Sequence, residues 1–160
     1  AITQPERVKT LTLITPFVDA TPRLLAVGKA WRSLAAEASS ETLARALLPW
    51  LFSSSFLADA AACDRTVRGL AQTVARVPAK TLERMTIGME SWSGSRTADL
   101  SGLSIPTLVV AAGEDLLTPY ASGIAQAIPD AKLLLVETSG HAVALESPDP
   151  VNEAIMAHLA

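Results

Sequence analysis

An acid and an imidazole lie near the C-terminal end of the sequence, each directly after an apolar run. Asp115 belongs to Gly113-Glu114-Asp115-Leu116-Leu117-Thr118-Pro119, and His141 belongs to Ser139-Gly140-His141, 26 positions later. A carboxylate can orient an imidazole through its ring N–H and stabilise the imidazolium that forms in general-base catalysis. The two residues therefore predict two members of a nucleophilic triad, with Asp115 as the acid and His141 as the base.

The third member of such a triad is a nucleophile. A serine nucleophile of this kind sits in a Gly-x-Ser-x-Gly elbow between a strand and a helix. No such segment occurs in the 160 residues, and neither Ser91 nor Ser139 has glycines at the required spacing. We therefore expect the nucleophile to lie outside this sequence, with Ser91 or Ser139 as a weaker alternative.

Other titratable residues compete with this interpretation. Glu114 is a rival acid, and Glu137 is a more distant one. Taken alone, Asp115 could be a turn or helix-cap residue, and His141 could be an ordinary loop histidine. Their order in the chain, acid before histidine, and their places at two strand ends favour the catalytic interpretation. His158 lies in a helical pattern near the terminus and is expected to be solvated or partly packed.

Strands that alternate with helices would position the acid and the histidine. Residues 8–15 alternate and thicken into an apolar strand, and 107–112 form a continuous apolar run that is typical of a central parallel strand covered on both faces. A third strand is predicted at 132–136, with helices at 119–128 and from Pro150 onward. Alternation of this kind predicts a parallel sheet, and ligands of such sheets bind at the carboxyl ends of the strands.

A helical insert separates the first strand from the rest. From Pro22 to about Ser93 the sequence is Ala-rich, with apolar residues at helical spacing, which predicts four short helices. The predicted fold class is α/β, with a partial parallel sheet of about three strands, flanking helices and an inserted four-helix cap. Residues 1–15 would belong to the core that contains the sheet, 16–98 to the cap and 99–160 to the C-terminal part of the core.

Four aromatic residues of the insert could border a substrate pocket: Trp31, Trp50, Phe52 and Trp92. The alternative is that each of them packs between cap helices. Because the Ala-rich insert has little charge that faces any inferable pocket, a large polyanionic substrate is not expected.

Composition narrows the classes of partner. The residues are 49% hydrophobic with mean hydropathy +0.32, yet no apolar stretch reaches the roughly 18 residues of a membrane span. With 13 basic and 16 acidic residues and no basic stripe, nucleic acid is not an expected partner. The single Cys63 excludes an intrachain disulfide, and no signal peptide is recognisable, so a reducing cytoplasm is expected. No metal-ligand cluster or phosphate loop occurs, and we expect no metal and no cofactor.

Several segments in the same order resemble a known family. They are Pro5-Glu6-Arg7-Val8 before a strand, a helical insert, the segment from Leu103 through Ile105-Pro106 to Asp115, and Ser139-Gly140-His141. Together they resemble the C-terminal half of α/β-hydrolase-fold enzymes. Within that superfamily the short cap is similar to that of small lactone, ester and amide hydrolases, such as enol-lactone hydrolases and aminoacrylate hydrolase-like proteins. The resemblance implies that Asp115 is the triad acid and His141 the triad base.

The resemblance also implies what the sequence lacks. In the family the elbow lies on the strand before 8–15, so the serine would fall a little upstream of Ala1. The loop that supplies an oxyanion-hole N–H is also missing, and loss of such donors costs several kcal/mol, on the order of 3–4 per donor, of transition-state stabilisation. We therefore expect residues to precede Ala1 and the chain alone to be inactive.

Two functions follow as alternatives. The first is the C-terminal portion of a serine-type α/β hydrolase that cleaves a small ester, lactone or amide. The second is a non-catalytic binding or assembly module derived from half of a hydrolase domain. In either case strand 8–15 would have an open edge. We expect that edge to pair with a missing N-terminal half or with a second copy of the chain.

Overall fold

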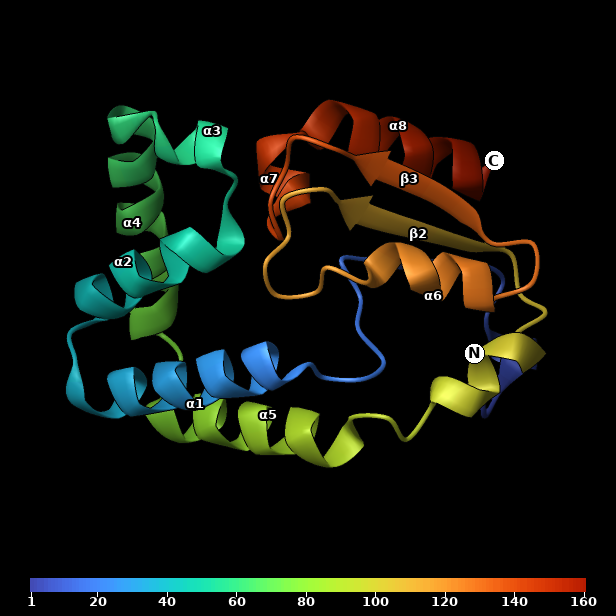
Figure 1. The fold of residues 1–160 in the computed structure, drawn as a ribbon, viewed down its shortest axis with the longest axis horizontal. Coiled ribbons are helices and arrows are strands. Elements are labelled where there is room, and N and C mark those ends of the chain that lie inside the picture. The colour runs from blue at the N-terminus through green and yellow to red at the C-terminus, as the bar shows by residue number, and fades with distance from the viewer.

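Three parallel strands form the single sheet of the protein. The computed structural model describes all of residues 1–160, and its strands are β1 (Leu11–Ile14), β2 (Thr107–Ala112) and β3 (Lys132–Val136) in the order β1-β2-β3 (Figure 1). Leu13 is in register with Val109, and Val109 with Leu133. The predicted partial α/β fold with a parallel sheet of about three strands is therefore confirmed.

The central strand β2 is covered on both faces, as its continuous apolar sequence predicts. All six of its residues are buried, and Val109 and Val110 are fully inaccessible. On the face of Val109, α6 (Ala121–Ala127) packs through Ile124. On the face of Leu108 and Val110, α8 (Pro148–Leu159) packs through Val151. The two apolar layers hold the sheet whose carboxyl edge carries the acid and the histidine.

Five helices lie between β1 and β2 in the sequence: α1 (Pro22–Glu37), α2 (Ser40–Leu51), α3 (Ser54–Leu57), α4 (Ala60–Ala75) and α5 (Ala79–Trp92). Four of them correspond to the predicted helices, and α3 is an additional single turn. The helices form two packed pairs beside the sheet, α1 with α5 and α2 with α4 (Figure 1). No helix of residues 1–160 combines the length and the apolar character needed to cross a membrane.

Side-chain caps explain where these helices begin. Thr21 accepts a hydrogen bond from the amide of Leu24, and Pro22 occupies the first turn of α1. Ser39 caps α2 in the same way, and Asp59 caps α4. Ser53 caps α3 through its contact with the amide of Phe56, which is why this turn forms directly after α2.

Three short elements connect the larger ones: the 3-10 helices η1 (Pro5–Arg7) and η2 (Thr97–Gly102), and α7 (Val143–Glu146). The prediction did not include η2 or α7. The last helix begins at Pro148, two residues earlier than predicted, and Pro49 lies inside α2.

Strand β1 differs from its prediction as a buried strand over 8–15. It covers only Leu11–Ile14, where the first three residues are half-buried and Ile14 is 40% exposed. The reason is that β1 pairs with β2 alone and stands at the edge of the sheet.

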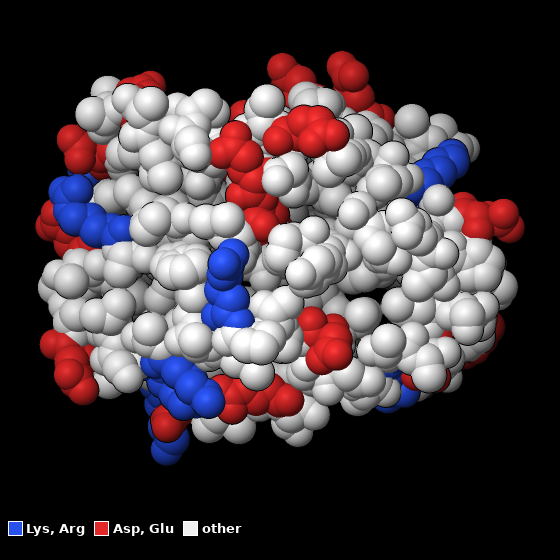
Figure 2. All heavy atoms as spheres, in the orientation of Figure 1, with Lys and Arg blue, Asp and Glu red and all other residues white.

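Charged side chains lie in small scattered groups on the face that Figure 2 shows. Several acidic ones lie near the boundary between α3 and α7, where the cap meets the core; this boundary is called the seam.

Candidate active site

The carboxyl ends of β2 and β3 bring two loops into direct contact. Gly113 follows β2 without a side chain, and a Cβ there would overlap the backbone of Glu137, which follows β3. The amide of Gly113 donates to Val136 O at 3.0 Å, and the amide of Glu114 donates to Ser139 O at 2.9 Å. This close approach places the acid loop beside the histidine loop at the sheet edge where α/β folds bind ligands.

Asp115 is buried and receives four hydrogen bonds. Its Oδ1 accepts from the amides of Leu117 and Thr118 at 2.8 and 2.9 Å. Its Oδ2 accepts from Thr118 Oγ1 at 2.6 Å and lies 2.9 Å from His141 Nδ1. Burial by itself raises the pKa of Asp115, but the hydrogen bonds from His141 and Thr118 and the charge of His141 outweigh it and hold the pKa below its ordinary value. The carboxyl group is therefore ionised at neutral pH.

His141 presents one ring nitrogen to Asp115 and keeps the other unoccupied. Because an ionised carboxylate only accepts, Nδ1 carries the hydrogen and donates to Asp115 Oδ2. No hydroxyl, thiol or carboxylate within residues 1–160 forms a hydrogen bond with Nε2. The side chain remains 27% exposed. The imidazole is thus oriented with Nε2 directed away from Asp115, where it is open to a hydrogen-bond partner.

Thr15 and Thr118 hold this pair in place, and sequence reasoning did not identify them. Thr15 directly follows β1 and has a left-handed φ of 44°, which is unusual for a β-branched residue. Its Oγ1 donates to His141 O at 3.2 Å, and its own carbonyl lies 3.0 Å from Thr118 Oγ1. Thr118 also contacts Asp115, whose position three residues earlier is the only sequence signal for this role. The residue that follows the first strand therefore contacts both loops of the site.

The rival acids lie elsewhere. Glu114 turns away from His141, and its Oε2 accepts from the amide of Ser54 at 2.8 Å. Glu137 is exposed and has no side-chain hydrogen bond within residues 1–160. Among the predicted acids, only Asp115 contacts the imidazole of His141.

The rival nucleophiles and the second histidine are also apart from the site. Ser139 is 1% exposed, and its hydroxyl pairs with that of Ser147 at 2.8 Å. Ser91 is exposed on α5. His158 is partly packed, as expected, and its Nε2 lies 3.2 Å from Leu11 O. Neither serine is hydrogen-bonded to the imidazole of His141.

A hollow of about 460 Å³ opens between the cap helices and the site. Apolar and aromatic side chains dominate its lining, which consists of Thr15, Pro16, Phe17, Leu24, Trp31, Met89, Trp92, Leu117, Thr118 and His141. Of the four aromatic candidates, Trp31 and Trp92 line this hollow. Trp50 packs against the apolar cluster of Leu24, Val27 and Leu117. Phe52 is buried and stacks on Phe56 with the ring centroids 4.3 Å apart.

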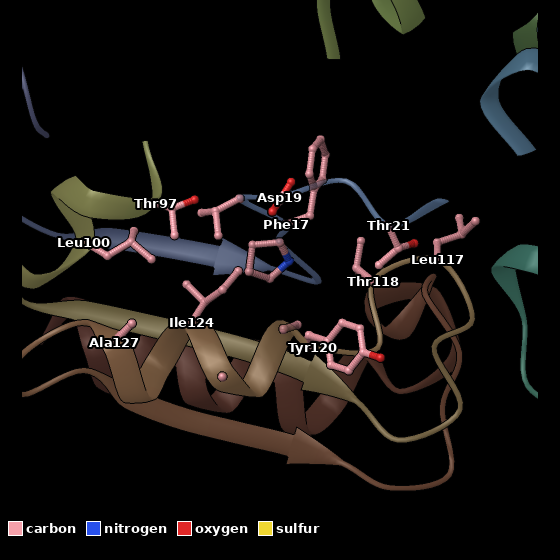
Figure 3. A pocket seen from close by; sticks show the side chains of 14 residues that line it. Phe17, Asp19, Thr21, Thr97, Leu100, Leu117, Thr118, Tyr120, Ile124 and Ala127 are labelled. Carbon is pink, nitrogen blue, oxygen red and sulfur yellow. The ribbon is translucent and has the colours of Figure 1, made fainter. Parts of the chain in front are cut away.

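A second hollow of about 280 Å³ lies between the segment after β1 and α6 (Figure 3). Phe17 and Asp19 come from the segment after β1, whereas Ile124 and Ala127 come from α6, and Tyr120 stands at its rim. His141 is not part of its lining. This hollow therefore touches the site only through shared residues such as Phe17 and Thr118.

Two curated proteins of the same name are similar to this chain over nearly its whole length. The chain is 28% identical over 162 aligned residues to the protein named "Putative carbamate hydrolase RutD" of Pseudomonas syringae pv. syringae, covering 99% of this chain and 61% of that protein. It is 29% identical to the protein of the same name from Azorhizobium caulinodans, covering 98% of this chain and 58% of that protein. The chain thus spans about three fifths of the length of these curated relatives.

Solved structures share the fold. The enol-lactonase from Burkholderia xenovorans LB400 has a TM-score of 0.82 at 18% identity, over 99% of this chain and 59% of that one. MGS-M2, an alpha/beta hydrolase enzyme from a Medee basin deep-sea metagenome library, has a TM-score of 0.83 at 20% identity, over 99% and 58%. The sequence pattern of the alpha/beta hydrolase family matches residues 2–154. With this match over nearly its whole length, the chain belongs to the alpha/beta hydrolase family.

Proposed function

We propose that this chain carries the acid and the base of a serine-type hydrolase that cleaves a small ester, lactone or amide. The observation that carries the proposal is the 2.9 Å contact between His141 Nδ1 and the buried carboxylate of Asp115. Asp115 would stay ionised throughout the reaction, because its lowered pKa keeps the proton on the imidazole.

The reaction would use Nε2 of His141 as its proton carrier. Nε2 takes the proton of a serine hydroxyl while the serine oxygen attacks the carbonyl carbon of the substrate. The resulting imidazolium then gives that proton to the leaving oxygen or nitrogen as its bond to the carbonyl carbon breaks. A water molecule, deprotonated by the same nitrogen, cleaves the acyl ester and restores the serine.

The nucleophile, in this proposal, comes from residues other than the 160 described. The lack of a hydrogen-bond partner for Nε2 of His141 supports this, as does the coverage of only about three fifths of the curated relatives. Either a further part of the same polypeptide or a second polypeptide could supply it, next to β1. The 160 residues alone would then be inactive. A non-catalytic binding module remains the second function.

The lining of the 460 Å³ hollow supports a small, uncharged substrate. Trp31 and Trp92 would form its apolar walls above His141, and Phe17 meets Trp92 edge-on at 5.6 Å. The names of the relatives, a carbamate hydrolase and an enol-lactonase, lie within the same range of carbonyl chemistry. We therefore include carbamates with esters, lactones and amides in the proposed substrate class.

A fluorophosphonate probe, which labels activated serines, tests the proposal in extract of the native cells. The labelled protein would be captured through peptides of this chain, and its intact mass and labelled residue determined. We expect a label on a serine outside residues 1–160 that lies in a Gly-x-Ser-x-Gly segment. Substitution His141→Ala should slow labelling by about 10²–10⁴-fold, and the control His158→Ala should not.

Each other outcome of this experiment contradicts part of the proposal. A label on Ser91 or Ser139 would place the nucleophile inside the chain. A folded protein that takes no label, and hydrolyses no p-nitrophenyl ester, would support the binding module instead.

A further inference from the structure

The segment between α2 and α3 lies directly against the loop that carries His141. The amide of Ala142 donates to Leu51 O at 2.7 Å. A Cβ at Gly140 would lie 2.7 Å from the carbonyl carbon of Phe52 and 2.8 Å from the amide nitrogen of Ser53. Both chain neighbours of His141 are therefore in contact with the helical cap, where α3 faces α7 (Figure 1).

The carboxylate of Glu146 joins the two sides of this contact. Its Oε1 accepts from the amide of Gly140 at 2.8 Å, one residue before His141. The same carboxylate accepts from the amide of Ser53 at 3.2 Å and from the Ser53 hydroxyl. Ser53 is 1% exposed, so water cannot easily replace these bonds. Hydrogen bonds to a charged acceptor are stronger than neutral ones, which makes Glu146 the main polar link across the seam.

A second glutamate binds the adjacent amide of the cap. Glu114 Oε2 accepts from the amide of Ser54 at 2.8 Å, and the amide of Glu114 donates to Ser139 O at 2.9 Å. The acid loop thus reaches the cap beside the bond of Glu146. Acidic side chains are seen near this seam in Figure 2.

We infer that Glu146 is a positioning residue that couples the placement of the cap to the orientation of His141. A shift of Ser53 would move the Glu146 carboxylate, which also accepts from the amide of Gly140. Gly140 precedes His141 and sets the position of its backbone. The far side of His141 is held separately, because its carbonyl accepts from Thr15. The inference rests on the proposed function only in taking His141 as the base.

The imidazole of His141 can be observed without substrate by NMR of the 160-residue chain. The readouts are the Nδ1 proton that donates to Asp115 and the exchange rates of the Ser53 and Gly140 amides. In Glu146→Gln we expect both amides to exchange at least about tenfold faster, because a charged acceptor is lost at each, and the Nδ1 proton signal to shift or broaden. The control is Glu153→Gln, which makes the same change on an exposed part of α8 and should alter none of the three signals.

Substitution Ser53→Ala tests the coupling from the cap side. It replaces Glu146→Gln as the test of the inference if that variant does not fold. Of the three bonds from the cap and Gly140 to Glu146, Ser53→Ala removes only that of the Ser53 hydroxyl, together with the side-chain cap of α3. A faster Gly140 amide and a changed Nδ1 signal would support the inference. If the Gly140 amide and the His141 ring stay unchanged while Ser53 loses protection, Glu146 merely attaches the cap, and the inference is overturned. Because no serine chemistry is involved, this result is independent of the probe experiment.

Discussion

At the scale of single residues, the site depends on a carboxylate that stays charged although it is buried. Asp115 is 3% exposed, and desolvation alone would favour its neutral form. The two backbone amides, the Thr118 hydroxyl and the His141 ring reverse that preference. The bond from His141 Nδ1 to Asp115 Oδ2 also fixes the tautomer of the ring, so the network that keeps Asp115 charged also orients His141.

The lowered pKa of Asp115 predicts a specific dependence of stability on pH. The unfolded carboxyl group, with its ordinary value of 3.8, takes up a proton before the folded one does. The stabilisation is therefore complete above that value and is lost as pH falls through the lower folded pKa. Asp115→Asn should reduce the free energy of unfolding at pH 7 by about 1–3 kcal/mol, and by less at pH 3.

Urea unfolding of the unchanged protein and of Asp115→Asn, at pH 7 and at pH 3, measures the loss of free energy of unfolding at each pH. Asp149→Asn, which changes an exposed carboxylate, is the control and should stay within about 0.5 kcal/mol of the unchanged protein at both values. An equal loss at pH 7 and pH 3 in Asp115→Asn would mean that the charge of Asp115 does not stabilise the fold.

At the scale of elements, the site is held together by loops that touch one another through their backbones. Gly113 allows the loop after β2 to touch the loop after β3, and Gly140 allows the histidine loop to touch the segment after α2. Neither position has space for a side chain. These contacts are needed because the acid and the histidine lie on different loops and must meet at 2.9 Å.

Gly140→Ala should therefore destabilise the chain. The new Cβ would lie within 2.8 Å of backbone atoms of Leu51, Phe52 and Ser53, and backbone can yield only if the cap moves. We expect a loss of about 1–3 kcal/mol, as for overpacked interiors, measured by urea unfolding. In Gly69→Ala the Cβ meets nothing within 4 Å, and the helix α4 should gain up to about 1 kcal/mol. Equal stability of the two variants would contradict the packing argument.

At the scale of the whole molecule, the sheet has two edges, formed by β1 and β3. Strand β1 pairs only with β2, and Ile14 at its end is 40% exposed. The amides of Leu11 and Thr15 donate toward β2, so the amide of Thr12, between them, faces the open edge by the alternation of a strand. An edge of this kind is a template for another strand.

We expect the 160-residue chain to associate through β1, with a second copy when no other partner is present. Light scattering should show a mass above 16.8 kDa that increases with concentration. Thr12→Pro removes an amide from the open edge and leaves the bonds to β2, so it should weaken association by about tenfold or more. A chain that stays monomeric, or a Thr12→Pro variant that associates equally well, would contradict pairing through this edge.

The sequence by itself determined most of the element types, their order and the two residues, Asp115 and His141, that meet at the carboxyl edge of the sheet. Apolar runs indicate β2 and β3 at their observed bounds. For β2 the run is continuous because the strand is covered on both faces. Four of the five cap helices were predictable because their apolar residues recur at helical spacing. The motifs around Asp115 and His141 predict the pair whose side chains lie 2.9 Å apart.

Only the tertiary structure decided which side chains meet across long separations. Thr15 contacts His141 over 126 positions, and Glu146 contacts Ser53 over 93, and no local pattern encodes either pairing. The choice of Asp115 over Glu114 also depended on the close approach of the two loops. The periodicity of a sequence indicates which residues of one helix or strand are buried. The site is formed by residues of several elements, so its contacts depend on how those elements pack together.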